Sequence, residues 1–423
     1  TDVEIYFKGG ISMDTASVVF ILFSSALVLF MTPGLAFFYG GLGRRKNVIN
    51  TMMMVILPIA IAVVMWFLVG YSLAFSGNGK FIGNFGNVLF RGVSETASTK
   101  GYKIPDAVFA LFQMMFSIIT VSIATGAVTG RIKFAPFLVF APIWLIFVYY
   151  PLAHMVWGGG LLAKMGALDF AGGDVVHISS GVSGLVLATI IGKRREFTRT
   201  EYRPHNVPFV LLGTGILAFG WLGFNAGSAL EANSTAIHAF ITTMLSLAAA
   251  TCSWVIIEKL SNGTPTLVGT STGLVAGLVA ITPGAGYVSY GSAILMGLLV
   301  SPICYFAISS LKHKLQYDDA LDAFGCHGVG GIFGGIATAI FTMPSLTPEK
   351  GNFGLLYGGT HLFGATIAAI LITAIWAGAF TFVIIKVIGV FLPLRATDRE
   401  EAVGMDDSEH KETAYPTFMG LDS

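Results

Sequence analysis

The chain consists mainly of apolar runs long enough to cross a lipid bilayer, and this limits its fold more than any other feature. A helix needs about 20 mostly apolar residues to cross the hydrocarbon core of a bilayer. We therefore expect an all-α polytopic membrane protein with eleven transmembrane helices, of which the eighth is short for a full span. The apolar runs lie at 18–39, 50–75, 107–128, 137–156, 175–191, 207–223, 236–257, 267–281, 291–311, 324–341 and 362–392.

The composition excludes several other classes of protein. Hydrophobic residues make up 54% of the chain and charged residues 11%, with a mean hydropathy of +0.77, a balance too apolar for a soluble protein of this length. A net charge of +1 without a dense basic run argues against a nucleic-acid partner. The three cysteines, Cys252, Cys304 and Cys326, lack the spacing of a disulfide framework or a thiolate metal site. We expect no metal and no cofactor.

The basic residues indicate an orientation in the membrane. With eleven spans the termini lie on opposite sides, and Lys and Arg concentrate in cytoplasmic loops. Sixteen of the 24 fall in one alternate set of loops, including 44–46 and 193–203, and seven fall in the other set. The bias predicts a multi-pass protein of the cytoplasmic membrane with its N-terminus outside and its C-terminus inside.

The two halves of the chain carry similar motifs. The fifth and tenth runs each carry an aspartate, a histidine and two glycines: Asp169, His177, Gly181 and Gly184 in one, Asp322, His327, Gly331 and Gly334 in the other. Five helices separate the two sets, so the halves have opposite orientations, as in transporters built from inverted repeats. We expect a transmembrane domain at 1–394, with repeats at about 16–193 and 206–342 and a final helix at about 361–393, and a cytoplasmic tail at 395–423.

His177 and His327 are the strongest candidates for function. Ionisable side chains within a membrane span are costly, and mark functional sites by default. Two neutral imidazoles that face each other provide a polar track without a fixed charge. The alternative is two unrelated core histidines bonded to backbone carbonyls, but their matching positions favour the pair. A metal site is a poorer interpretation, because no third histidine or cysteine lies near either of them in sequence.

Three aspartates and one tryptophan accompany the histidines. Asp169 and Asp322 precede them and are interpreted as caps of helix N-termini. Asp174 lies three residues before His177, and two roles stay open: it orients that imidazole or faces an outer vestibule. Trp157 ends the fourth run on the predicted outer side, where an indole face can hold a small cation.

At these residues the sequence resembles the ammonium transporter family of Amt, Mep and Rh proteins, and most closely its Amt branch. The resemblance runs from the first apolar run into the tail. It is carried by the segments 38–42, 153–160, 169–177, 192–194, 224–228 and 324–328.

The resemblance implies a site, residue by residue. It implies an outer ammonium site of Phe112, Phe116, Trp157 and Ser228, and a gate formed by Phe116 stacked on Phe224. The twin histidines, His177 and His327, would line the pore below this gate. Asp169 would organise the outer site from behind without touching the ion.

The resemblance also implies partners. The family forms homotrimers in which each subunit has its own pore, and its tail often works with a PII-type nitrogen regulator. Residues 404–415 resemble that tail. Two departures stand out: Asp174 where a small or hydroxyl residue is expected, and Lys411 where glycine is usual.

The function predicted from the sequence is ammonium transport, with ammonium deprotonated at the outer site and ammonia passing the histidines. A neutral gas channel or an ammonium sensor on the same fold is the alternative, and the cation site formed by Trp157 and Ser228 argues against a gas channel. An intramembrane hydrolase is disfavoured, because no nucleophile or metal set lies at a matching depth. The protein is therefore not expected to be an enzyme.

Overall fold

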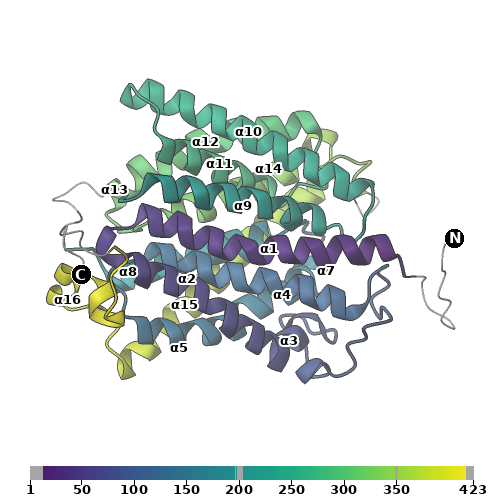
Figure 1. The fold of residues 1–423 in the computed structure, drawn as a ribbon. Coiled ribbons are helices and arrows are strands. Elements are labelled where there is room, and N and C mark those ends of the chain that lie inside the picture. Colours follow the sequence, from purple (N-terminus) through teal and green to yellow (C-terminus); the bar gives the residue numbers. More distant parts are fainter. Residues whose placement is uncertain (1–12, 196, 198–202, 348–350, 416–423) are drawn as a thin grey trace.

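The computed structural model describes residues 13–195, 197, 203–347 and 351–415, and within these residues it contains helices but no β-strand. Ten helical segments in this part of the chain are long and apolar enough to cross a membrane. They lie side by side along one common direction (Figure 1). The eighth predicted run forms α11 (Leu267–Ile281), which is 15 residues long and shorter than the other ten, so its status as a full span stays a prediction.

The first half of the chain supplies five of the long segments, and several of them contain a π-helical turn. They are α1 (Thr15–Leu42), α2 (Val48–Met65) continued by Trp66–Gly70 and α3 (Tyr71–Phe75), α4 (Asp106–Ile123), α5 (Phe134–Trp144) continued by Leu145–Tyr149 and α6 (Tyr150–Val156), and the π-helical turn η6 (Gly173–Ile178) continued by α8 (Ser179–Ile191). The short helix α7 (Leu161–Lys164) precedes η6.

The second half repeats this arrangement. Its segments are α9 (Val207–Gly227), α10 (Ser234–Asn262), α11, α12 (Tyr290–Phe306) continued by Ala307–Leu311 and α13 (Lys312–Leu315), and the π-helical turn η8 (Phe324–Gly328) continued by α14 (Val329–Phe341). The long helix α15 (Thr360–Phe391) follows. In Figure 1 the two halves form two layers that meet where α1 lies against α9.

Side-chain caps fix the beginnings of many of these helices. Asp14 accepts hydrogen bonds from the N–H groups of Ala16 and Ser17 at the start of α1, and Asn206 accepts one from Phe209 at the start of α9. Such caps satisfy N–H groups that have no partner within the helix. Apolar runs and capping residues together explain why the predicted and observed helices coincide so closely.

The fifth and tenth segments cross at glycines. A Cβ atom at Gly181 would lie 2.3 Å from the backbone nitrogen of Gly328, and one at Gly331 would lie 3.1 Å from the Cβ atom of His177. These two contacts are reciprocal, because Gly181 and Gly331 occupy the same place in the two repeats. The close approach brings η6 and η8 together in the middle of the bundle, where lipid provides no hydrophobic force to associate the helices.

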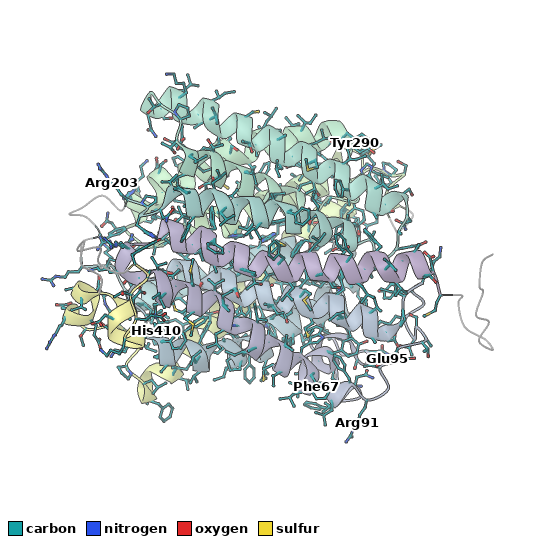
Figure 2. All side chains as sticks on the ribbon, in the orientation of Figure 1. Phe67, Arg91, Glu95, Arg203, Tyr290 and His410 are labelled. Carbon is teal, nitrogen blue, oxygen red and sulfur yellow. The ribbon has the colours of Figure 1, made fainter. Side chains whose placement is uncertain are left out.

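The loops rich in basic residues and the loops poor in them are expected at opposite ends of the bundle. Arg203 and His410 lie at the end that carries α16 (Asp398–Val403), which we call the tail end, and Arg91 and Glu95 lie near the opposite end (Figure 2). Arg203 and Arg91, which the sequence assigned to opposite sides of the membrane, therefore lie towards opposite ends of the bundle. Which end faces the cytoplasm stays a prediction.

The described part of the tail is held by the protein's own loops. Lys46, in the turn after α1, donates to the carbonyls of Glu401 and Ala402 at 2.9 and 2.6 Å. Asn50 donates its backbone N–H to Asp406 at 2.9 Å. The tail thus closes over the ends of α1 and α2.

The basic loop at 193–203 offers Arg194, Arg195, Arg199 and Arg203 as candidate partners for the acidic residues of the tail, and Arg199 lies outside the described residues. Glu400 pairs with Lys133 at 2.8 Å and Glu401 with Arg395 at 3.0 Å, whereas Arg194 pairs with Asp318 at 2.6 Å. Arg195 donates its backbone N–H to Glu401 at 2.8 Å.

Candidate functional site

Three cavities lie between the two repeats, and they share lining residues with the predicted site. The distal cavity, away from the tail end, has a volume of about 430 Å³; the central cavity has about 10 Å³ and the tail-side cavity about 60 Å³. The distal cavity is lined by Tyr102, Phe109, Gln113, Phe116, Val156, Trp157, Phe170, Ser228 and Leu230. A volume of about 10 Å³ holds roughly one water-sized molecule, so the passage is narrowest at the centre.

Trp157, Phe116 and Ser228 meet at the distal cavity. The indole N–H of Trp157 donates to the backbone carbonyl of Asp169 at 2.9 Å, which fixes the ring and leaves its face open. The rings of Phe116 and Trp157 are perpendicular, with centroids 5.8 Å apart. The hydroxyl of Ser228 donates to the carbonyl of Phe224 at 2.8 Å, so its oxygen lone pairs stay available as acceptors.

Phe116 and Phe224 separate the distal cavity from the central one. Their ring centroids lie 4.3 Å apart with an angle of 31° between the planes. Phe116 lines the distal cavity and Phe224 lines the central one, so the pair closes the connection between them.

Phe112 does not line the distal cavity. It is fully buried, and its ring packs edge-on against Phe116, with centroids 5.0 Å apart. A Cβ atom at Gly227 would lie 2.8 Å from the same ring. Phe112 therefore supports Phe116 from behind, at a position that the sequence assigned to the site itself.

The two histidines meet at the centre of the bundle. The Nδ1 atoms of His177 and His327 lie 3.2 Å apart, and both side chains are almost fully buried. One Nδ1 must donate and the other accept, so the two rings hold opposite tautomers. The pair can then offer one donor and one acceptor at the two Nε2 atoms, and Nε2 of His177 has no hydrogen-bond partner among the described residues.

A further residue, Trp221, holds the histidine pair in place. Its ring is stacked on His177, with centroids 5.3 Å apart and an angle of 25° between the planes. Its indole N–H donates to the hydroxyl of Thr282 at 2.9 Å. Sequence reasoning missed Trp221 because one tryptophan among many aromatic residues has no distinguishing pattern.

Asp169 caps η6. Its two carboxylate oxygens accept hydrogen bonds from the backbone N–H groups of Gly172, Gly173, Asp174 and Val175 at 2.6 to 3.3 Å. The carboxylate thus satisfies the first turn of the segment that carries His177. Through its own carbonyl, Asp169 also orients Trp157.

The cap of η8 is Asp319, and the assignment of this role to Asp322 is corrected. Asp319 accepts from the N–H groups of Ala323 and Phe324 at 3.0 and 2.7 Å. Asp322 instead pairs with Lys312 and has a positive φ of 59°, as Gly172 has a φ of 121° at the matching place of the first repeat. The sequence contained the signal: Asp169 and Asp319 each precede their histidine by eight residues, whereas Asp322 precedes His327 by five.

The carboxyl group of Asp174 is buried, and one of its oxygens lacks a hydrogen bond. The residue is 5% exposed, and its Oδ1 atom has no hydrogen-bond partner. It does not line the distal or the central cavity. Neither of the two roles left open by the sequence, orienting His177 or facing the vestibule, is carried by a contact in the part of the chain that the structure describes.

These features define a multi-pass membrane protein whose two repeats enclose a narrow row of cavities with a histidine pair at its centre. Among the described residues, no group of three or more His, Cys, Asp or Glu side chains is placed to hold a metal ion. The chain belongs to the Ammonium Transporter Family, whose model matches residues 19–415.

Individual relatives agree with this assignment. The chain is 46% identical over 407 residues to an ammonium transporter of Bacillus subtilis, an alignment that covers 96% of this chain and all of the relative. The crystal structure of Candida albicans Mep2 is similar with a TM-score of 0.86 and 33% identity, over 92% of this chain and 88% of that one. A solved structure titled Sensor Amt Protein also has a TM-score of 0.86, at 26% identity, over 93% of this chain and 98% of that one.

Proposed function

We propose that this chain transports ammonium across the cytoplasmic membrane, binding the ion in the distal cavity and conducting ammonia past the histidine pair. The observation that carries the proposal is the order in which three kinds of side chain line one path. An aromatic and hydroxyl site that suits a small cation is followed by a closed phenylalanine pair and then by a neutral polar track. Transport is also the activity for which the Bacillus subtilis relative is named.

The distal site distinguishes ammonium by its hydrogen bonds. Ammonium and potassium are of similar size, but only ammonium donates hydrogen bonds and gives up a proton. The faces of Trp157 and Phe116 stabilise the positive charge, while the oxygen of Ser228 accepts one N–H. Loss of a proton to the distal side leaves ammonia, which enters the central cavity beyond Phe116 and Phe224.

The histidine pair then carries a neutral molecule. A cation in the central cavity would lose its hydration among mostly apolar side chains, at a large cost in free energy. Ammonia can donate to one imidazole nitrogen and accept from another, so His177 and His327 compensate its desolvation. On the tail side it regains a proton to form ammonium.

We also propose an assembly and an orientation. The N-terminus lies outside and the tail end faces the cytoplasm, in line with the distribution of basic residues. The protein forms a homotrimer with one path in each subunit, and a PII-type regulator binds at the tail end. The docked tail supports this last proposal, because it forms a folded surface at the tail end to which a regulator can bind.

Ammonium sensing is a second candidate, favoured by the likeness to the Sensor Amt Protein. A sensor needs to bind ammonium but not to release it on the other side. A transport measurement therefore distinguishes the two functions.

The test is the flux and current of purified protein in proteoliposomes under gradients of ammonium, methylammonium or potassium. We expect a saturable ammonium flux above that of protein-free liposomes and no potassium flux. Binding without flux would favour the sensor, and potassium flux equal to that of ammonium would overturn the proposal.

A further inference from the structure

Among the described residues, Gln113 is the one whose polar side chain both lines the distal cavity and has a buried atom without a hydrogen-bond partner. It is 8% exposed, and its Oε1 atom has no hydrogen bond. Within the described residues, the amide nitrogen of Gln113 donates no hydrogen bond either. A buried amide without partners destabilises a protein unless water or a ligand satisfies it.

The helix register directs Gln113 into the cavity. Phe109, Gln113 and Phe116 are four and three residues apart along α4, so they lie on one helix face, and all three line the cavity. The neighbouring Phe112 is turned away, behind Phe116. Gln113 is therefore positioned between the two aromatic rings that border the site.

We infer that Gln113 is a further ammonium-binding residue, whose amide oxygen accepts a second N–H of the ion opposite Ser228. This inference rests on the proposed function. A glutamine side chain has one acceptor end and one donor end of nearly equal shape, and rotation about its last bond exchanges them. In the presence of a cation, the oxygen is the end that faces the ion.

The site then matches the four N–H groups of ammonium with two kinds of acceptor. Gln113 and Ser228 take two of them through oxygen, and the faces of Trp157 and Phe116 receive the remaining positive charge. A hydrogen bond between a neutral acceptor and a charged donor is stronger than one between neutral groups. Gln113 thus compensates part of the hydration that ammonium loses when it enters the cavity.

The test compares two variants of nearly the same shape, Gln113→Met and Gln113→Glu, in the proteoliposome assay. Methionine removes both hydrogen-bonding ends, so the half-saturation concentration for ammonium should rise about tenfold. Glutamate adds a negative charge to the acceptor, so half-saturation should fall by about as much while the maximal rate decreases, because the ion is held and deprotonates less readily. Met114→Leu, next on α4 and outside the cavity lining, is the matched control and should transport like the wild type.

Opposite shifts in half-saturation are the result that a merely structural role cannot produce. If both variants weaken ammonium binding, or if neither changes it while the wild type transports, Gln113 is not a ligand. If the wild type itself transports no ammonium, the proposed function fails first, and the role of Gln113 falls with it.

Discussion

Trp157 is fixed at the rim of the distal cavity by the carbonyl of Asp169, and this single hydrogen bond decides what the ring can do. With its N–H engaged, the indole can offer only its π face to the proposed ion. The proposed cation–π contact therefore depends on the geometry of Asp169, although Asp169 does not line the cavity.

Replacing Trp157 with leucine keeps an apolar side chain but removes the π face. A cation–π contact is worth about 0.5 to 2 kcal/mol. Half-saturation for ammonium should therefore rise by roughly two- to thirtyfold. Measured flux curves with an unchanged half-saturation would make Trp157 an interface residue without a role in binding.

Asp174 leads to a prediction about stability. Its carboxyl is buried beside Asp169 and lacks a hydrogen bond to Oδ1. Asp174→Thr removes this uncompensated group while keeping the backbone N–H that Asp169 accepts, so the protein should be stabilised by about 1 to 3 kcal/mol. Thermal unfolding in detergent measures the effect, and a lower midpoint temperature would mean that the carboxyl has a partner in the native protein.

His177, His327 and Asp169 are recognisable in the sequence because they interrupt or flank apolar runs at matched places in the two halves. Trp157 stands out by its place at the end of a span, and Ser228 was identified only through the family resemblance. Asp319 was readable from its spacing to His327 but was hidden by the nearer Asp322. The buried position of Phe112 and the exposure of Gln113 to the cavity depend on helix rotation, which hydropathy does not determine.

At the scale of elements, η6 and η8 are the segments on which the site depends. Each follows an aspartate cap and continues into a helix, α8 or α14, whose glycine lies at the crossing that brings the histidines together. The apolar runs predicted both segments within a few residues, but not their π-helical geometry, because a wider turn leaves the mean hydropathy unchanged.

The two caps should contribute unequally to stability. Asp169 accepts four backbone N–H groups and Asp319 accepts two, and buried N–H groups without a partner are costly. Each of Asp169→Ala and Asp319→Ala should lower the free energy of unfolding by at least about 1 kcal/mol, and Asp169→Ala should lower it more. The unfolding temperatures of the two variants should follow the same order. Asp322→Asn leaves all these N–H groups bonded. If it were the most destabilising of the three, the assignment of Asp319 as the cap would be wrong.

The docked tail should respond to pH through Glu400. A hydrogen bond from Lys133 holds the pKa of Glu400 at about 2, below its ordinary value of 4.5. Because the pKa is depressed by docking, this contact stabilises the docked tail above about pH 4.5, and the contribution is lost as the pH falls towards 2. High salt should also weaken it, since Glu400 lies near the surface.

Hydrogen exchange of α16 amides measures this contribution when wild type and Glu400→Gln are compared at equal pH. Wild-type protection should exceed that of the variant at pH 6, and the difference should shrink towards pH 3. A difference that stays constant with pH would assign the stabilisation to another contact.

At the scale of the whole molecule, the arrangement follows from two halves of opposite orientation that cross at their centre. The class of protein, the spans and the repeats were predictable from hydropathy and from paired motifs. The route from the distal cavity to the tail side was not, since it arises only where helices that are distant in sequence pack together. Trimer formation and membrane orientation stay predictions, because a single chain contains neither its neighbours nor the bilayer.

The histidine pair is the proposed polar track for ammonia, and the ammonium flux of His177→Ala and His327→Ala, measured relative to their potassium flux, tests this role. Both variants remove an imidazole from a site whose packing is held by Trp221 and Phe224, so the protein should still assemble in the membrane. We predict that each variant loses selective ammonium transport in proteoliposomes. Wild-type ammonium flux with an unchanged preference over potassium in either variant would contradict the account.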